Sequence, residues 1–259
     1  MITPAGERWR QSLAGWAVPE EILKQAPESP WIHPPQLFQI PNEIADSISH
    51  RLAREAIPAN GSILDIGCGG GVATFAVTPP AKVVSGVDHQ QEMLDMYAAN
   101  AKGRDLAATV ILGFWPEVSA LTPVADVVVA HHVVYNVQNI ESFLLEMDSH
   151  AANRVIVEMP QRHPLSNASE LWNHFWNLNR PSQPTQENLM EVLDELGLAA
   201  QVQLWDGEMR GEGDLELLAH YSRIRLCLPE NREKEVLEFL QDNPIDTSRK
   251  LATIWWDKN

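Results

Sequence analysis

The sequence predicts an α/β protein built on an open, doubly wound, parallel sheet. Five short apolar runs lie between residues 63 and 159, and helical spacings of apolar residues occupy the gaps between them. Strands that alternate with helices are typical of parallel sheets covered on both faces. The unbroken apolar character of the fourth run agrees, because a strand buried on both faces has no polar side to show. The runs are 63–66, 82–88, 108–112, 125–130 and 154–159.

Helices are predicted where apolar residues recur every three or four positions. Residues 72–77 give a short helix before two prolines, 91–98 a second helix and 140–147 a third. After residue 160 the alternation continues, with a capping signature and a stop at Gly197 on the next helix. The later elements that we expect are a helix that begins at 184–187 and stops at Gly197, strand six at 201–205, strand seven within 215–228, an amphipathic helix at 230–240 and a last apolar piece at 251–256.

The first strand ends in a glycine-rich turn, which runs to residue 71 and is the strongest functional signal in the chain. Glycines stand at 67, 69 and 71, and Val72 occupies the sixth place of a G-x-G-x-x-G count, so the dinucleotide fingerprint is not met. Missing Cβ atoms allow positive φ and let a ligand approach the main chain. Asp65 at the strand end can accept a hydrogen bond from an amino group or an ordered water. A glycine turn without any ligand is the plainer alternative.

The second strand also ends in an acidic residue, and this pairing makes the signal more specific. Asp88 follows the glycines by about 20 residues, the spacing expected of a carboxylate that binds ribose hydroxyls. Ligands of open α/β sheets sit at the carboxyl ends of the strands. Asp65, Asp88, Gly113 and His131 all fall at such ends.

An Asp two residues before the first glycine, with G-x-G-x-G spacing, resembles the first motif of class I S-adenosylmethionine-dependent methyltransferases. The resemblance covers residues from about 60 to 160 motif by motif, and the C-terminal part as a general pattern. It implies a seven-stranded, mostly parallel sheet whose last two strands form an antiparallel hairpin, with strand seven between strands five and six. It also implies S-adenosylmethionine as the cofactor and S-adenosylhomocysteine as the product.

The resemblance assigns roles to individual residues. The glycine turn would line the methionine and ribose, Asp88 would hold the ribose diol, and His89 and Met93 would flank the adenine. Phe114 stands where the family often has an acidic residue, so adenine recognition would depend on backbone groups or on stacking against Phe114 or Trp115. The predicted cofactor-binding residues are Asp65, Gly67, Cys68, Gly69, Gly71, Asp88, His89, Met93, Gly113, Phe114, Trp115 and His131.

Composition limits the partners of the protein. The formal net charge is −16, and no basic stripe stands out, which disfavours nucleic acid as a substrate. Two cysteines, Cys68 and Cys227, offer neither a disulfide framework nor a paired metal motif, and the adjacent His131 and His132 point in different directions, so no metal site is expected. Without a leader or a membrane-length apolar run, we expect a cytoplasmic protein that binds no membrane.

Aromatic residues outside the sheet suggest a lid over the methyl acceptor. They gather in residues 1–41 and in a helix after strand five for which Ser166 or Asn167 is the expected N-cap. Packing on the sheet is the competing explanation for each of these aromatics taken singly. The predicted substrate-binding residues are Trp31, His132, Tyr135, Trp172 and Trp176. The candidates for a general base are His131, His132, Tyr135 and His33.

The chain is expected to form one domain over residues 1–259. Its parts would be an N-terminal lid or cap segment at 1–45, a cofactor-binding half at 46–160, an inserted lid helix at 161–186 and a C-terminal half at 187–259. The leading hypothesis is a small-molecule methyltransferase. An RNA or protein methyltransferase, a non-catalytic protein that binds S-adenosylmethionine or S-adenosylhomocysteine, and a nicotinamide-dependent oxidoreductase are the alternatives. The sequence leaves the acceptor and the oligomeric state open.

Overall fold

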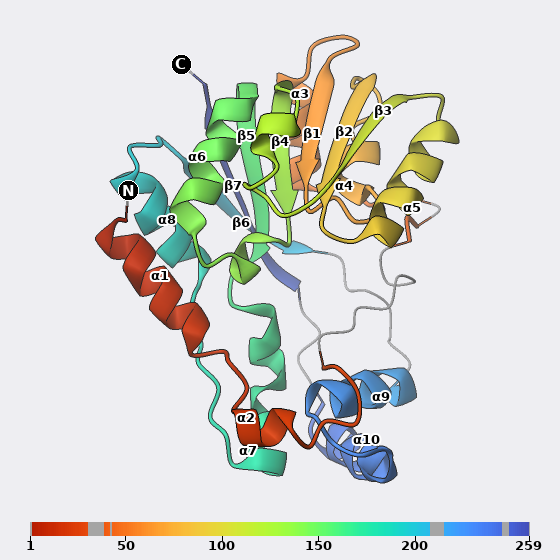
Figure 1. The fold of residues 1–259 in the computed structure, drawn as a ribbon, viewed down its shortest axis with the longest axis vertical. Coiled ribbons are helices and arrows are strands. Elements are labelled where there is room, and N and C mark those ends of the chain that lie inside the picture. The colour runs from red at the N-terminus through yellow and green to blue at the C-terminus, as the bar shows by residue number, and fades with distance from the viewer. Residues whose placement is uncertain (1, 31–38, 42, 208–214, 245–248, 259) are drawn as a thin grey trace.

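The computed structural model describes the whole chain except residues 1, 31–38, 42, 208–214, 245–248 and 259. A twisted sheet with helices on both faces forms one part of the molecule, and a group of helices lies beyond one end of the strands (Figure 1). The carboxyl ends of the parallel strands point toward this group. We call the group the cap; it consists of α2 (Glu20–Leu23), α7 (Ser169–Trp176), α9 (Leu215–Arg225) and α10 (Glu233–Asp242).

The sheet has seven strands in the order β3-β2-β1-β4-β5-β7-β6. Strand β7 runs antiparallel to both of its neighbours, and the other pairings are parallel. This arrangement confirms the predicted fold, including the place of strand seven between strands five and six. The strands are β1 (Ser62–Ile66), β2 (Val83–Asp88), β3 (Ala107–Leu112), β4 (Ala125–His131), β5 (Ala151–Pro160), β6 (Gln201–Gly207) and β7 (Arg249–Asp257).

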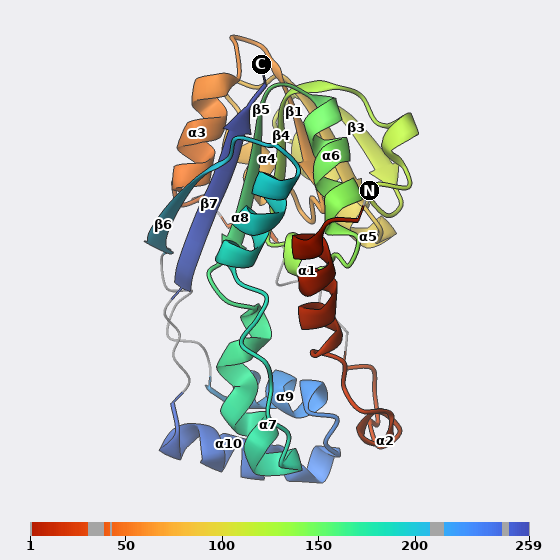
Figure 2. The same cartoon turned by 90° about the vertical axis from the view of Figure 1, so that its left-hand side faces the viewer.

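Two hydrophobic cores hold the sheet between layers of helices. On one face, α3 (Ile48–Ala56), α4 (Val72–Phe75) and α5 (Gln91–Lys102) pack on β1, β2 and β4. On the other face lie α1 (Pro4–Ala14), α6 (Ile140–His150) and α8 (Gln186–Glu195). Figure 2 shows α3 on the side of the sheet opposite to α6 and α8. This doubly covered arrangement explains the apolar runs of the central strands.

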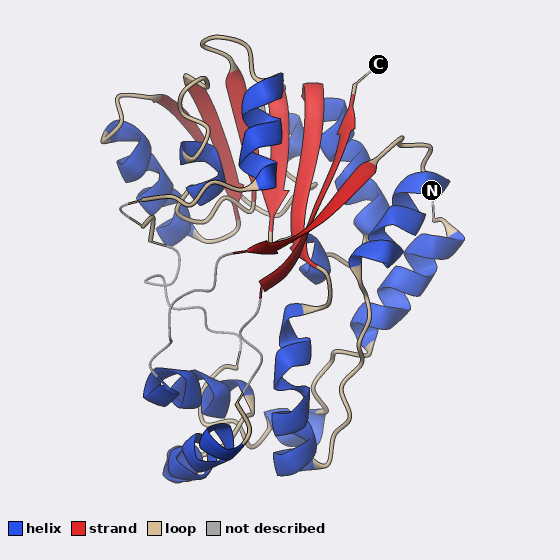
Figure 3. Ribbon diagram, turned by 180° about the vertical axis from the view of Figure 1, so that it is seen from behind, coloured by secondary structure: helices blue, strands red, loops and turns tan. Residues whose placement is uncertain are grey.

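The cap has a small core of its own, assembled from segments that are far apart in the sequence. Val18 and Ile22 meet Leu171 and Trp172 of α7, and all four pack with residues of α9 and α10. Figure 3 shows these helices grouped beyond the sheet. The cap therefore includes part of the predicted N-terminal segment, the predicted lid helix and a stretch of the C-terminal half. The division of the chain at residues 45, 160 and 186 stays a prediction.

The prediction of strand seven within 215–228 is wrong. Residues Leu215–Arg225 form helix α9, and the seventh strand is Arg249–Asp257, which contains the last apolar piece of the sequence. Ala219 and Arg223 are buried one helical turn apart, so a helix places both toward the cap core. Cys227 accordingly follows a helix instead of lying in a strand.

The expected N-cap of the lid helix is also wrong. A short 3-10 turn, η4 (Pro164–Ala168), precedes α7 and includes both Ser166 and Asn167, so the helix begins at Ser169 without a side-chain cap. His163 instead caps the 3-10 turn by accepting a hydrogen bond from the Leu165 N–H. The capping signature of the next helix is confirmed as a capping box between Thr185 and Asn188. Within the described residues, none of the helices is long and apolar enough to cross a membrane.

Candidate functional site

The glycine turn after β1 is tied to the end of β2 by backbone hydrogen bonds. The N–H groups of Gly67 and Cys68 both donate to the carbonyl of Val87, at 2.8 and 3.1 Å. Gly67, Gly69 and Gly71 have φ values of 70°, 50° and 94°. A Cβ atom on Gly67 would lie 2.5 Å from Val133. The turn therefore requires glycine because of both its backbone conformation and its packing.

Asp88 completes this turn from the neighbouring strand. Its Oδ2 accepts a hydrogen bond from the Gly69 N–H and its Oδ1 accepts one from the Gln90 N–H, both at 3.0 Å. The residue is only 7% exposed. Each carboxylate oxygen has two lone pairs, so each can still accept a hydrogen bond from a ligand hydroxyl. Asp88 is thus held in place by the chain and remains able to bind a diol.

Asp65 lies deeper, at the end of β1. Its Oδ2 accepts a hydrogen bond from the Thr74 hydroxyl at 2.8 Å, and the Tyr97 hydroxyl in turn donates to Thr74. Burial raises the pKa of Asp65 to about 7, although the hydrogen bonds from Thr74 act in the opposite direction. The structure therefore gives Asp65 a partner that the sequence did not indicate. Its predicted contact with a ligand amino group stays a prediction.

Aromatic side chains mark the ends of β2 and β3. The rings of His89 and Phe114 stack with centroids 4.9 Å apart, and Phe114 is 65% exposed. Trp115 is instead buried in the core, where its indole N–H donates to the carbonyl of Phe143. Of the two aromatics proposed for adenine stacking, Phe114 is therefore the accessible one. Met93 is buried on α5.

Gly113 connects β3 to this aromatic pair. Its φ is 154°, and a Cβ atom there would lie 2.2 Å from Val118. Its N–H donates to the carbonyl of Asp88 at 2.9 Å. The ends of β2 and β3 are therefore joined next to the predicted ribose site.

A cluster of polar side chains lies at the ends of β4 and β5. His131 and Glu158 are register partners on these strands, and the His50 ring of α3 stacks on His131 with centroids 5.7 Å apart. The His132 Nε2 lies 3.2 Å from the Glu158 Oε1. The Ser49 and Thr253 hydroxyls, which hydrogen-bond at 2.7 Å, border the same cluster. The structure thus brings together both predicted histidines with residues that the sequence did not indicate.

Burial and charge set the protonation states of this cluster. Burial lowers the pKa of His131 to about 4, although the nearby Glu158 carboxylate acts in the opposite direction. Burial likewise lowers the pKa of His50. Burial alone would raise the pKa of Glu158, but the nearby histidines and the Ser49 hydroxyl outweigh it and hold the pKa well below its usual range. At neutral pH the ionised Glu158 carboxylate therefore lies beside neutral imidazoles of His50 and His131.

The predicted acceptor-binding aromatics divide between the sheet and the cap. Tyr135 lies in the 3-10 turn η3 (Val134–Asn136) after β4, and its ring meets His163 edge-on at 5.7 Å. Trp172 is only 4% exposed, and the Trp176 indole donates to the Leu226 carbonyl. Both tryptophans thus help to hold the cap together, and their contact with a substrate stays a prediction. Trp31 and His33 lie outside the described residues.

Arginine and aromatic side chains join the N-terminal segment to the lid region. The Arg180 guanidinium lies 5.1 Å from the Trp16 ring centre and 5.0 Å from that of Trp172. Trp16 stacks on His163 at 4.0 Å. These contacts fasten Trp16 of the N-terminal segment to residues before, within and after α7 of the cap.

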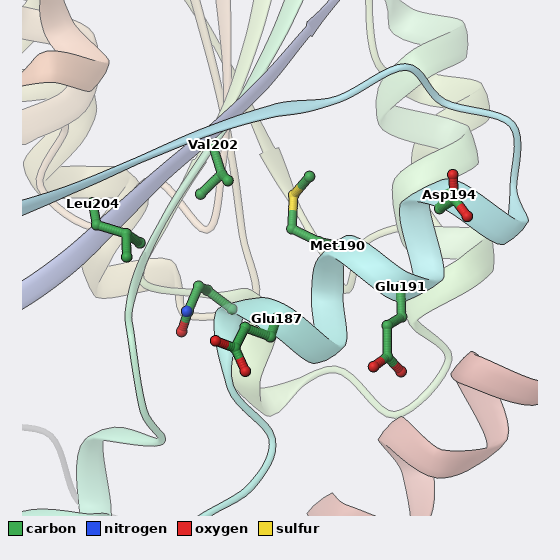
Figure 4. Close-up of a pocket in the computed structure, with 7 residues that line it drawn as sticks. Glu187, Met190, Glu191, Asp194, Val202 and Leu204 are labelled. Atoms are coloured by element: carbon green, nitrogen blue, oxygen red, sulfur yellow. The ribbon is translucent and has the colours of Figure 1, made fainter.

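Figure 4 shows an open groove between α8 and β6. Strand β6 is the edge strand farthest from β2 and β3 in the sheet. Val202 and Leu204 of this strand form the apolar side of the groove. The side chains on α8 are mostly acidic. The α8 residues that line the groove are Gln186, Glu187, Met190, Glu191 and Asp194. This groove contains none of the residues predicted to bind the cofactor.

The residues at the carboxyl ends of the parallel strands fit S-adenosylmethionine. The turn supplies backbone at positive φ where side chains are absent, Asp88 keeps an acceptor site on each oxygen, and Phe114 offers an exposed ring. The connection from Gly67 to Val72 also departs from the dinucleotide pattern. The model of a family described as a methyltransferase domain matches residues 63–153, which span β1 through the start of β5. Residues 63–153 are a class I methyltransferase domain. The cofactor of this domain is S-adenosylmethionine.

Solved structures share the fold of this chain at low sequence identity. The YcgJ protein from Bacillus subtilis is 18% identical with a TM-score of 0.56, over 82% of this chain and 98% of the other. Magnesium protoporphyrin IX methyltransferase from Synechocystis PCC 6803 with bound S-adenosylhomocysteine is 12% identical with a TM-score of 0.54, over 100% and 96%. The [4+2]-cyclase SpnF is 14% identical with a TM-score of 0.53, over 85% of each chain. No curated protein matches by sequence.

Sequence reasoning missed His50 and Glu158. Glu158 is the next-to-last residue of the fifth run, so its position near a strand end was a signal that could have been used. His50 carries no such signal, because only the packing of α3 against β4 and β5 brings it to His131.

Proposed function

We propose that the protein transfers a methyl group from S-adenosylmethionine to a small-molecule acceptor at the carboxyl ends of the parallel strands. The observation that supports this most strongly is the joint geometry of Gly69 and Asp88. A glycine turn at positive φ is fixed by a carboxylate that still has acceptor sites for a ribose diol. The family match over residues 63–153 supports the same proposal.

In this proposal each side chain binds or orients, and the bound cofactor supplies an electrophilic methyl group on a sulfonium. Asp88 would hold the ribose hydroxyls, and the turn at Gly67 and Gly69 would lie along the methionine and ribose. Phe114, with His89 stacked on it, would cover one face of the adenine. Because methyl transfer is an in-line displacement, the main task of the chain is to align the acceptor and exclude water.

The acceptor would lie between the ends of β4 and β5 and the cap. His131, His132 and Tyr135 come from the sheet side of this region. A small molecule is favoured over nucleic acid because the net charge is −16. Structures of the same fold include an enzyme named as a porphyrin methyltransferase, which agrees with a small acceptor.

Two other functions remain as competitors. The chain could methylate RNA or protein, or bind the cofactor without turnover. SpnF, which is named as a [4+2]-cyclase, has the same fold, so this fold also carries reactions other than methyl transfer. Release of S-adenosylhomocysteine in the presence of an acceptor separates turnover from binding alone.

A calorimetric titration with S-adenosylhomocysteine tests the cofactor assignment. We expect binding by the wild type and at least a tenfold weaker affinity for Asp88→Ala, because hydrogen bonds to a charged group contribute about 1.5–3 kcal/mol each. Asp95→Ala is the matched control, since this exposed carboxylate on α5 accepts a hydrogen bond from Gln91 and lies outside the glycine turn. Unchanged affinity in Asp88→Ala would contradict the ribose assignment, and binding of NAD in place of S-adenosylhomocysteine would contradict the function.

A further inference from the structure

The polar cluster at the ends of β4 and β5 contains three side-chain atoms that are shielded from solvent and have no hydrogen-bond partner. They are His50 Nδ1, His131 Nε2 and Glu158 Oε2. His50 and Glu158 are 6% and 5% exposed. A buried polar atom without a partner costs about 1–3 kcal/mol, so three in one cluster indicate a missing ligand group.

With the His50 proton on Nε2, two of these three atoms are hydrogen-bond acceptors. A neutral imidazole that carries its proton on Nε2 has a lone pair on Nδ1. Glu158 Oε2 belongs to a carboxylate and also accepts only. In this tautomer, a single group that pairs with both atoms supplies two hydrogens.

The charge of the cluster narrows the chemistry further. Glu158 is ionised and the His50 and His131 rings are neutral at pH 7, so the three residues with unpartnered atoms carry one negative charge, while an Arg249 guanidinium nitrogen lies 3.3 Å from His132. An anionic ligand would be repelled, and it would bring no hydrogens. A hydroxyl brings one hydrogen and would leave one buried acceptor unsatisfied. A primary amine brings two hydrogens as the neutral form and three as the ammonium.

Metal binding does not explain the cluster. Within the described part of the chain, no three His, Cys, Asp or Glu side chains gather closely enough to hold a metal ion. Glu158 Oε1 already lies 3.2 Å from His132 Nε2, and that nitrogen also lies 3.3 Å from an Arg249 guanidinium nitrogen. The unpartnered atoms therefore match a hydrogen-bond donor better than a cation that needs several ligands.

We propose that His50 and Glu158 bind a primary amine of the methyl acceptor, and that the enzyme is an N-methyltransferase. This rests on the proposed function and names its substrate class. The two N–H groups would donate to His50 Nδ1 and Glu158 Oε2. An amine that arrives as ammonium first releases one proton to water. Its nitrogen lone pair then forms the N–CH3 bond as the S–CH3 bond breaks, the electron pair stays on sulfur, and the product leaves as a methylammonium.

The test uses methylammonium chloride as the probe, with methanol and acetate as matched probes. The full-length protein, saturated with S-adenosylhomocysteine, is titrated while the imidazole NMR signals of His50 and His131 are followed. We expect methylammonium to bind at least tenfold more tightly than methanol, and acetate to cause no shift of these signals. Equal affinity for methylammonium and methanol, or a preference for acetate, overturns the proposal.

Three variants make the test specific. Glu158→Gln keeps the size of the side chain and should weaken methylammonium binding at least tenfold. If Glu158→Gln fails to fold, His50→Phe removes the other proposed acceptor and should weaken methylammonium binding by the same factor. Glu141→Gln is the matched control, because Glu141 is 3% exposed and its oxygens already accept hydrogen bonds from Thr3 and Arg10 on the opposite face of the sheet. Methylammonium binding that survives both Glu158→Gln and His50→Phe overturns the proposal.

A crystal structure of the same complex gives a second readout. Density for methylammonium bonded to Glu158 Oε2 and His50 Nδ1 supports the amine site. A buried water also offers two hydrogens, so a water that keeps this place at saturating methylammonium overturns it. The calorimetric affinity for S-adenosylhomocysteine is measured on the same samples. If it is normal while the amine site fails, the N-methylation proposal alone is lost, and if it is absent, the proposed function itself has failed.

Discussion

Two regions at the carboxyl ends of the strands, one next to β1 and β2 and the other next to β4 and β5, differ in how their polar side chains are hydrogen-bonded. Next to β1 and β2, Asp65 and Asp88 both accept hydrogen bonds from the chain itself. Next to β4 and β5, His50 and Glu158 each keep an atom without a partner. The carboxylates of the first region are therefore held by the chain before a ligand arrives, whereas in our proposal the acceptor amine pairs the open atoms of the second. This difference suits a constant cofactor at one end and a specific acceptor at the other.

The sequence predicted the first region far better than the second. Strands β1 to β5 were found because parallel strands buried on both faces are continuously apolar, and Gly67, Asp65 and Asp88 lie in local motifs next to them. The acceptor side depends on contacts between distant segments, such as His50 with His131. Helix α9 was mistaken for a strand because its apolar residues fit both periodicities, and only its place in the cap core decides between them.

The largest expected effect comes from crowding the preformed turn. Gly71→Val would place a Cβ atom 2.3 Å from Phe75 at a φ of 94°. Backbone strain and overpacking together should lower the free energy of unfolding by about 2–6 kcal/mol. Urea denaturation measures this loss.

Gly197→Ala is the matched control for that substitution. Gly197 also has a positive φ of 74°, but a Cβ atom there would meet nothing within 4 Å. Only the strain should remain, about 1 kcal/mol. If both variants lose the same stability, the turn is not as tightly packed as the contacts of Gly71 indicate.

The next effect is a pH dependence caused by Asp65. Because its pKa is raised to about 7 in the folded state, the folded protein keeps a proton that the unfolded chain releases above about pH 4. Its contribution to the free energy of unfolding is complete below pH 4 and is lost as pH rises to about 7, by up to about 4 kcal/mol.

Asp65→Asn should remove this loss, so that the stability of the variant relative to the wild type improves from pH 4 to pH 7. Urea denaturation over this range gives the comparison, with Asp95→Asn as an exposed control on α5. A constant difference between Asp65→Asn and the wild type would show that Asp65 is ionised in the folded protein at low pH, and the raised pKa would then be wrong.

The smallest effect concerns the exposed aromatic at the adenine end. Phe114→Ala should weaken S-adenosylhomocysteine binding about fivefold, since stacking a base on an aromatic ring contributes about 1–3 kcal/mol and a ring that is 65% exposed gives the low end of this range. Leu112→Ala, another exposed apolar residue at the end of β3, should leave the affinity unchanged. Equal losses in the two variants would indicate general disturbance of β3 instead of stacking.

A crystal structure of the protein with S-adenosylhomocysteine would test the preformed cofactor site most directly. We predict that the ribose hydroxyls lie within hydrogen-bond distance of the Asp88 carboxylate and that the ligand runs along Gly67 and Gly69, with its sulfur toward His131. Ligand density in the groove between α8 and β6, or anywhere else than the carboxyl ends of β1, β2 and β4, would contradict this prediction.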